Sequence, residues 1–434
     1  MTPLELGLII SLITILVLAL GVPVAFGLTF ISLIFIFIFE GVFGLQFVGE
    51  LFFSGLDDFT LISIPMFIAM GAAVASSPAG ADLYGSFERV FRKVPGGLAI
   101  SNIGACSIFS ALSGSSPATC AAIGKMGIPE MQKRGYPDSL ATGAIAAGGT
   151  LGILIPPSVT MIVYGIATGT SIGRLFLAGI GPGILITLMF CIWAVIYTKI
   201  YGQNISAPPP KLSLSEYFVI LPRVLPFILL IVMILYVLYG GIATPSEAAG
   251  VGAVICFLLI ATVYKIWQPK RLWEILRDCT KESVMIMMII AAAALFSYML
   301  SALFVTQSMA EYIADLDMNR WILLFIVNIF LLVAGFFLPP VAVIVMTAPV
   351  LIPIITSAGF DPYWFAVILT INMEIGLITP PVGLNLYVIN GIAPNVKLNE
   401  ILRGALPFAL IMVLAIIIIS IFPEIATWIP DQFG

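Results

Sequence analysis

The sequence predicts an all-α protein that crosses a membrane many times and consists of two inverted halves. Three observations support this prediction. The 434 residues are 61% hydrophobic and only 9% charged, whereas a soluble domain is about 25% charged. A short phrase recurs once in each half, and the basic residues gather on one side of the predicted spans. At about 20 residues per span, the spans and their loops take up nearly the whole chain.

The repeated phrase marks a break inside one hydrophobic segment of each half. It is GGTLGILIPPS at 148–158 and NMEIGLITPPV at 372–382. Gly152 corresponds to Gly376, and the proline pair that follows recurs as well. Glycine and proline both weaken helices. Discontinuous helices at corresponding positions of two repeats are typical of substrate and ion sites in membrane transporters.

Two apolar segments, 96–131 and 321–356, fit re-entrant hairpins better than single crossings. Each contains a break of small residues and proline near its middle, at 110–117 and 335–340. Irregular backbone at membrane depth is tolerated only where protein or a water-filled cavity surrounds it. The other apolar runs predict ten spans, two of them broken, at 4–20, 22–39, 56–76, 138–168, 178–199, 217–239, 245–264, 282–306, 361–391 and 405–422.

The distribution of Lys and Arg predicts the orientation of the chain. With the N-terminus outside, all but two of the 18 basic residues lie on the cytoplasmic side, and only Arg174 and Arg320 lie outside. Each half then holds an odd number of spans and one hairpin, so the two halves are inverted. We expect a first repeat at 1–200, a cytoplasmic linker at 201–216, a second repeat at 217–422 and an outer tail at 423–434. Both chain ends would be periplasmic.

Local patterns predict two further kinds of element. The short amphipathic segments 81–93 and 268–281 predict two arm helices that lie along the cytoplasmic interface. The run Thr244, Pro245, Glu247 predicts a capping box that opens a helix.

The composition excludes several classes of protein. The chain has no His, so it lacks the commonest metal ligand and the usual proton carrier near neutral pH. Its five Cys show no Cys-x-x-Cys spacing. An intramembrane hydrolase is the alternative from another class, because the run 114–116 faintly resembles a serine nucleophile, but its base would be missing. We therefore predict no enzymatic activity, no organic cofactor and no nucleic-acid partner.

Four long segments, 113–136, 148–183, 241–253 and 373–393, resemble a known family. In this order they are similar to the large membrane subunit of tripartite ATP-independent periplasmic (TRAP) transporters, in its C4-dicarboxylate-like branch, and the likeness runs almost end to end. The resemblance implies an elevator-type, Na⁺-driven importer of organic acids, with the inverted-repeat fold of the ion transporter superfamily, in the bacterial inner membrane.

The resemblance also implies partners. They are the organic-acid substrate, a four-helix small membrane subunit, a periplasmic substrate-binding protein and membrane lipid. A stand-alone Na⁺/dicarboxylate symporter of the same architecture is the alternative within transporters.

Motif positions in that family imply one Na⁺ site in each half, between a hairpin tip and the broken helix of the same half. Backbone carbonyls and hydroxyls at these breaks are hard oxygen ligands, which such an ion prefers. The expected ligands are Ser113, Ser115, Gly148, Thr150, Gly152, Gly335, Gly376 and Thr379.

An organic anion at the middle of a bilayer needs compensating positive charge. Helix N-termini carry free N–H groups and the positive end of the helix dipole, and we expect them at Pro117, Pro157, Pro340 and Pro381. Polar side chains near the breaks are further substrate candidates, namely Ser116, Thr119, Ser158, Asn372 and Asn385. The alternative is that such residues only let membrane helices pack closely.

Glu374 is a carboxylate deep in a predicted span, at the position that Thr150 holds in the other half. Such a residue is a functional candidate. It could ligate Na⁺, titrate or contact a polar part of the scaffold. Because it would repel an anionic substrate, we expect an indirect role. At the second hairpin tip, Leu338–Pro339 stands where many members of the resembled family carry Asp or Glu.

Overall fold

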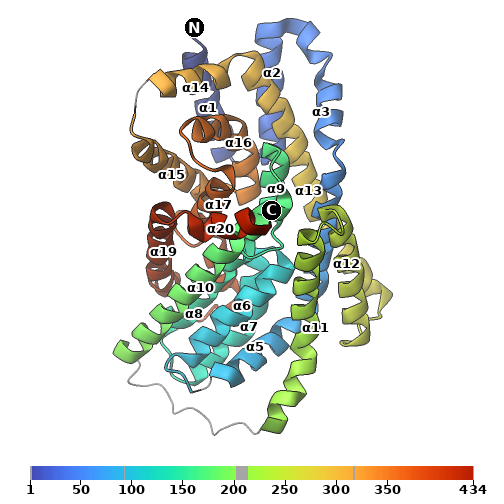
Figure 1. Ribbon diagram of the computed structural model, residues 1–434, viewed down its shortest axis with the longest axis vertical. Coiled ribbons are helices and arrows are strands. Elements are labelled where there is room, and N and C mark those ends of the chain that lie inside the picture. The colour runs from blue at the N-terminus through green and yellow to red at the C-terminus, as the bar shows by residue number, and fades with distance from the viewer. Residues whose placement is uncertain (1, 92, 202–213, 316–317, 434) are drawn as a thin grey trace.

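The computed structural model is built from helices throughout (Figure 1). It describes residues 2–91, 93–201, 214–315 and 318–433, and no strand occurs in these ranges. The all-α prediction is therefore confirmed. The helices are α1 Pro3–Ala19, α2 Val24–Leu45, α3 Val48–Leu56, η1 Phe59–Ile62, α4 Ser63–Ala75, α5 Ala79–Phe91, α6 Gly97–Ser113, α7 Ser116–Lys133, α8 Asp138–Leu154, α9 Val159–Thr168, α10 Ile172–Tyr201, α11 Leu214–Tyr239, α12 Pro245–Thr262, α13 Pro269–Ala302, α14 Val305–Asp315, α15 Arg320–Phe337, α16 Pro340–Ser357, α17 Pro362–Leu377, α18 Leu384–Ile392, α19 Leu398–Ile421 and α20 Glu424–Phe433.

Each predicted span coincides with a helix or with two helices that meet at a break. Among the described residues, eight helical segments are long and apolar enough to cross a membrane, one of them α8 and α9 taken together. A ninth span results if the bent pair of α3 and η1–α4, which meet at 62°, is counted as one. Two of the eight are the arms of the second hairpin, α15 and α16. A multi-pass membrane fold is thus confirmed. The number of ten crossings and the sides of the two termini stay predictions.

The segment 96–131 folds back on itself as α6 and α7. Gly114 ends α6 with a φ of +59°, a left-handed conformation that glycine adopts easily. Ser115 then caps α7 by accepting a hydrogen bond from the Ala118 N–H. The two helices are antiparallel, since the Asn102 amide donates to Met131 Sδ at 3.0 Å, far from the turn.

The second hairpin consists of α15 and α16, which contact each other and are joined by Leu338–Pro339. Pro340 lies in the first turn of α16, where its missing N–H costs nothing. In Figure 1 this hairpin lies in the upper left of the view, and α6, α7 and α8 lie in the lower part.

The repeated phrase breaks a helix in each half. The first break, 155–158, separates α8 from α9, and the second, 378–383, separates α17 from α18. Ser158 caps α9 by accepting from the Met161 N–H at 3.3 Å. Gly383, with a φ of +57°, precedes α18.

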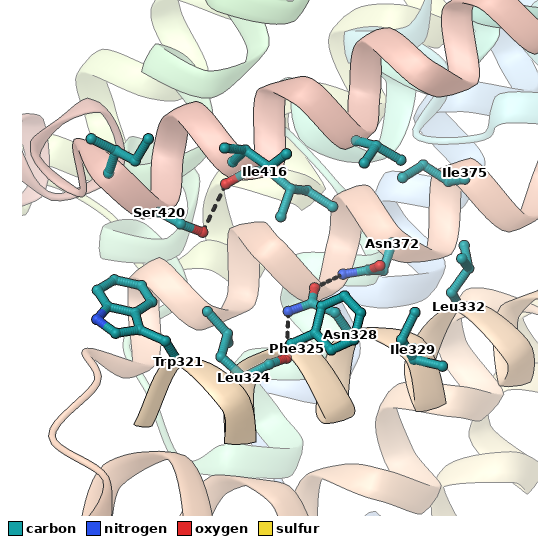
Figure 2. Close-up of a pocket in the computed structure, with 13 residues that line it drawn as sticks. Trp321, Leu324, Phe325, Asn328, Ile329, Leu332, Asn372, Ile375, Ile416 and Ser420 are labelled. Atoms are coloured by element: carbon teal, nitrogen blue, oxygen red, sulfur yellow. Dashed lines mark hydrogen bonds between the residues drawn. The ribbon is translucent and has the colours of Figure 1, made fainter. Parts of the chain in front are cut away.

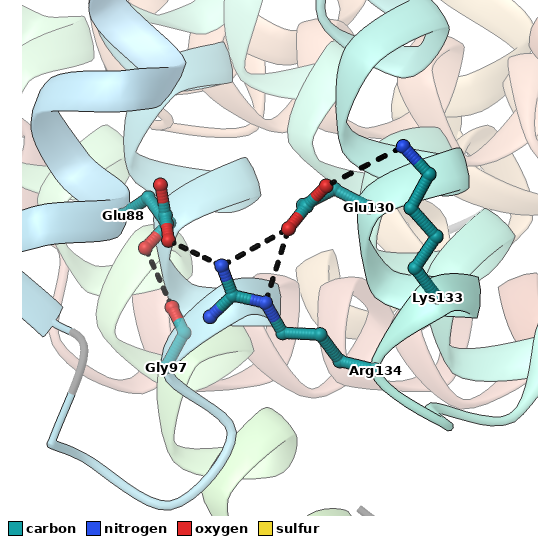
Figure 3. A network of polar contacts seen from close by, with 6 residues as sticks. Glu88, Gly97, Glu130, Lys133 and Arg134 are labelled. Carbon is teal, nitrogen blue, oxygen red and sulfur yellow. Dashed lines mark hydrogen bonds and ion pairs between the residues drawn. The ribbon is translucent and has the colours of Figure 1, made fainter. Parts of the chain in front are cut away.

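One expected arm helix is present as a separate element, and the other is not. α5 is separate and is tied to the end of α7, because Arg134 forms ion pairs with Glu88 of α5 at 2.6 Å and with Glu130 of α7 at 3.0 Å (Figure 3). The prediction of a separate helix at 268–281 is wrong. That segment is the first part of α13, a continuous helix of 34 residues. After Pro269, its first residue, α13 contains no Gly or Pro, the residues that commonly interrupt a helix.

The capping box is confirmed, because the Glu247 N–H donates to Thr244 Oγ1 and the Thr244 N–H donates to Glu247 Oε2. Most of the expected linker 201–216 lies outside the described residues. The expected outer tail contains α20, which packs against α10, where Arg174 pairs with Asp431 at 3.3 Å.

The helices form two groups that meet at the breaks. In the first half α8 packs against α6, α7 and α10, and it also packs against α19 of the second half. A second group joins α4 to α12 and α13, and α13 to α2. In Figure 1 this second group lies along the right of the molecule. The hairpin tips therefore lie between the broken helices and a separate set of long helices.

Candidate functional site

Backbone carbonyls at the tips and breaks lack their usual helical donor, because the helix ends there or because a proline lies four residues later. In an α-helix the N–H of each residue bonds the carbonyl four residues earlier, and proline has no N–H. Four of these carbonyls belong to Ser113, Gly152, Gly335 and Gly376, four residues before Pro117, Pro156, Pro339 and Pro380. Each half thus has such a carbonyl at a hairpin tip and at a helix break. Such groups are suited to ligands other than the helix itself.

In each half, glycine lets the broken helix approach its own hairpin closely. A Cβ at Gly376 would overlap the Gly335 carbonyl oxygen at the end of α15. A Cβ at Gly152 would lie 2.8 Å from Ser110 Cβ, one turn before the tip of the first hairpin. The two contacts occupy corresponding places in the two halves. The expected arrangement, in which each tip faces the break of its own half, is present.

Both tips and both broken helices line a single cavity of about 880 Å³. Its wall contains the first tip from Ser113 to Ala118, and Pro339 and Pro340 of the second. α4 and α13 form the facing wall, and α2 contributes Pro23 and the residues that follow. By the predicted topology, Pro23 and Lys281 lie at the cytoplasmic ends of the predicted spans 22–39 and 282–306, so the cavity extends toward that side.

The hydroxyls of the first tip are organised by the tip itself. Ser113 Oγ and Thr119 Oγ1 are 2.9 Å apart, and Thr119 also donates to the Ser115 carbonyl at 2.9 Å. The Ser113 carbonyl lies directly against Gly71 of α4, where a Cβ would overlap it. Ser113 and Ser115 line the cavity, whereas Thr119 is fully buried behind them.

Ser116 contacts the opposite half. Its hydroxyl donates to Glu374 Oε1 at 2.7 Å. Both residues are buried, and Glu374 is only 1% exposed. The other carboxylate oxygen, Oε2, has no hydrogen-bond partner within the described part of the chain, and neither has either polar atom of the Asn385 side chain. Glu374 of the second half therefore contacts the first hairpin, and its role stays a prediction.

Several expected site residues lie away from the cavity. Thr150 donates to the Ala147 carbonyl at 2.6 Å, and its hydroxyl faces Met412 of α19. Gly148 packs against Cys106, and its carbonyl lies within the unbroken part of α8. Thr379 donates back to the Ile375 carbonyl at 2.7 Å.

Asn372 lines a different groove, of about 620 Å³, between α15, α17 and α19 (Figure 2). There its amide donates to Asn328 Oδ1 and to the Ile368 carbonyl. The remaining lining is mostly aliphatic and aromatic. Asn372 is therefore separated from the tip cavity.

Two of the four helices expected after the breaks begin later than predicted. α7 and α16 begin at Ser116 and Pro340, as the prolines indicate. α9 and α18 begin at Val159 and Leu384, so the expectation of N-termini at Pro157 and Pro381 is wrong. In each case the proline pair lies inside the break, because two consecutive prolines also force the preceding residues away from helical geometry.

Four polar residues of the cavity wall were not expected from the sequence. They are Thr160 at the start of α9 and three consecutive residues of α13, Thr280, Lys281 and Glu282. Lys125, the basic residue nearest the breaks in sequence, is exposed and does not line this cavity. Lys281 lies on α13, in the group of helices that contains α4 and α12. Only the tertiary fold brings it to the cavity, so no local sequence motif indicates its position there.

The described residues contain no cluster of three or more His, Cys, Asp or Glu side chains. A cation at the tips would therefore be held mainly by carbonyl and hydroxyl oxygens. The four carbonyls that lie four residues before a proline, together with Ser113 and Ser115, fit such a hard ion.

Comparisons with known proteins agree with this architecture. The family model described as "Tripartite ATP-independent periplasmic transporter, DctM component" matches residues 11–425. The C4-dicarboxylate TRAP transporter large permease protein of Pseudomonas aeruginosa is 39% identical over 382 residues, covering 88% of each chain. The sialic acid TRAP transporter large permease protein of Vibrio cholerae is 30% identical over 413 residues, covering 95% of this chain and 96% of the relative. The solved YdaH transporter of Alcanivorax borkumensis shares the fold, with a TM-score of 0.66 over 91% of this chain and 90% of that chain, at 14% identity.

Proposed function

The chain belongs to the DctM component family of tripartite ATP-independent periplasmic transporters, and on this premise we propose that it imports an organic acid by Na⁺-coupled, elevator-type transport. The family is one of transporter permeases and not of enzymes. We place the chain in the bacterial inner membrane, with both termini on the periplasmic side. Four-carbon dicarboxylates are the substrate class we favour.

The observation that carries the proposal is the cavity shared by both hairpin tips and both broken helices. An anion in this cavity would lie near the N-terminal ends of α7, α9 and α16, whose N–H groups and dipoles favour negative charge. Bound Na⁺ at the tips would supply further positive charge. A substrate site of this kind needs no basic side chain at the middle of the membrane.

The two groups of helices suggest how the substrate would cross. The hairpins and broken helices would move as one body against α2, α4 and α13, which form the other wall of the cavity. The cavity extends to Lys281, on the predicted cytoplasmic side, which is consistent with an inward-facing state. Close contacts such as the Ser113 carbonyl against Gly71 would have to break and re-form during this movement.

We infer the substrate class from the relatives to which this chain is similar, and these relatives are named for more than one substrate. The relative that is 39% identical is named for C4-dicarboxylates, and the one that is 30% identical is named for sialic acid. We favour C4-dicarboxylates because of the higher identity. Competition between succinate and sialic acid for uptake tests this choice.

As partners we propose a four-helix small membrane subunit and a periplasmic substrate-binding protein. The test is uptake of radiolabelled succinate into proteoliposomes that contain the chain alone, the chain with its small subunit, or both with the binding protein. We expect uptake only in the complete system. Uptake by the chain alone would instead favour the stand-alone Na⁺/dicarboxylate symporter.

The Na⁺ sites are tested by combining Ser115→Ala with Gly376→Ala. We expect the Na⁺ concentration for half-maximal uptake to rise. Ser420→Ala is the matched control, because Ser420 lies on α19 and donates only to its own helix. If the double variant keeps the Na⁺ dependence of the wild type, the assignment of the tip sites is wrong.

A further inference from the structure

Glu374 is a buried carboxylate with one hydrogen bond. It lies near the end of α17, 1% exposed, and accepts from Ser116 on one oxygen only. Its other oxygen has no partner among the residues that the structure describes. Burying a charge without full compensation is costly, so the charged form of this group requires a further partner.

Asn385 is the second unsatisfied group in the same region. It lies in the first turn of α18 and is fully buried, and neither its Nδ2 nor its Oδ1 has a described partner. Two such atoms on one side chain are unusual, since most buried polar atoms are hydrogen-bonded. An amide carbonyl without a donor is a good ligand for a hard cation.

Contacts around Gly149 bring these groups together. The point where a Cβ would lie at Gly149 is 3.0 Å from the Ser116 carbonyl oxygen and 3.6 Å from Asn385 Nδ2. Ser116 is also the residue that bonds Glu374. Ser116, Glu374 and Asn385 therefore lie in one region, beside Cys120, where α7 and α8 of the first half meet α17 and α18 of the second.

We propose that Glu374, Asn385 and Ser116 form a cation site that takes Na⁺, between the two halves and separate from the sites at the tips. The site rests on the proposed Na⁺ coupling and adds an ion with a carboxylate ligand to it. Oε2 of Glu374 and Oδ1 of Asn385 would be the ligands now without partners, and Ser116 would hold Oε1 in place.

The location gives the ion a specific role. Its two ligands come from the two parts of the broken helix of the second half, and the hydrogen bond from Ser116 ties Glu374 to the first hairpin. Occupation of the site would therefore hold the first hairpin to the opposite half, so that both breaks move together. The ion would also cancel the negative charge of Glu374, which otherwise repels the anionic substrate.

The test compares ²²Na⁺ binding to the purified chain and to its Glu374→Gln and Asn385→Ala variants. We expect one Na⁺ fewer per chain in Glu374→Gln, and an affinity for that ion that is at least about tenfold lower in Asn385→Ala, a loss of about 1.4 kcal/mol. Glutamine keeps the shape of a neutral glutamic acid. Wild-type Na⁺ binding in Glu374→Gln would show that no cation is held there, and it would overturn the proposal.

Two controls separate this site from the others. Ser115→Ala with Gly376→Ala should weaken Na⁺ at the tips and leave the ion at Glu374 bound. If wild-type chain binds no Na⁺ at all, the proposed Na⁺ coupling fails; if it binds Na⁺ and Glu374→Gln binds it equally, only the site at Glu374 fails. Should both variants fail to fold, an electron-microscopy map of the wild type in Tl⁺ decides, because density beside Glu374 is expected and its absence contradicts the site.

Discussion

The hydroxyl of Ser116 in α7 donates to Glu374 in α17 at 2.7 Å, which joins a hairpin of the first half to the broken helix of the second. Both side chains are buried, and the bond adjoins the first tip, where Ser116 also lines the cavity. The two halves therefore touch through polar groups at the place where their breaks meet. A change in one half is expected to affect the other.

Removing this bond should destabilise the protein. Ser116→Ala would leave Glu374 without its hydrogen bond, and an unsatisfied buried group costs about 1–3 kcal/mol. We expect a lower apparent melting temperature in detergent. Ser101→Ala is the matched control, because Ser101 is equally buried but donates only to the Gly97 carbonyl of its own helix. Equal losses in the two variants would argue against a special role for the contact between halves.

The close approach of α17 to the second hairpin predicts that a single methyl group impairs transport. In Gly376→Ala the added Cβ would overlap the Gly335 carbonyl, and overpacking of this kind costs about 1–3 kcal/mol. Displacement of the tip should lower Na⁺-driven uptake by at least about tenfold, since about 1.4 kcal/mol corresponds to a factor of ten. Gly391→Ala is the control, because no atom lies within 4 Å of its Cβ position. Unchanged uptake by Gly376→Ala would contradict the packing described.

The contact between α4 and the first tip predicts a different effect. A Cβ at Gly71 would overlap the Ser113 carbonyl, and this contact joins the two groups of helices. Gly71→Ala should therefore disfavour the conformation seen here and shift the accessibility of a single cysteine introduced in the cavity wall, measured by its labelling rate. Gly85→Ala in α5, with open space at its Cβ position, should leave that rate unchanged.

The ion pairs of Arg134 predict a local effect on α5. The guanidinium bonds Glu88 and Glu130 at 2.6 and 3.0 Å (Figure 3), and its side chain is 24% exposed. Arg134→Gln should raise hydrogen exchange in α5 and cost about 1 kcal/mol or less, because partly exposed ion pairs contribute little. Lys133→Gln is the control, since Lys133 is 75% exposed and lies 4.0 Å from Glu130. If α5 exchanges as in the wild type, the pair does not hold it.

Much of the fold could be predicted because glycine and proline act locally. The proline pairs at 156–157 and 380–381 mark both broken helices, and Gly114 marks the first hairpin tip. The carbonyls of Gly152, Gly335 and Gly376, which lack helical donors, also follow from sequence, because each lies four residues before a proline. The continuity of α13 was harder to predict. The amphipathic segment 268–281 suggested a separate helix, but a change from amphipathic to apolar sequence does not by itself end a helix.

Other parts of the site depend on contacts between distant segments. Nothing near Ser116 in the sequence indicates that it bonds Glu374, and nothing near Lys281 indicates that it lines the cavity. Asn372 and Thr150 have the right polarity and lie near the breaks, yet they face α15 and α19. Which side of a buried helix meets a given neighbour is set by the packing of the whole bundle.

The central claim is that both hairpin tips and both breaks form one Na⁺-coupled site for an organic acid. The most direct measurement is succinate uptake by proteoliposomes that contain the chain, its small subunit and the binding protein, with and without an inward Na⁺ gradient. We predict uptake that requires the gradient and that is strongly reduced in the Ser115→Ala, Gly376→Ala double variant while Ser420→Ala retains it. Uptake of equal rate without Na⁺, or in the double variant, would contradict the account.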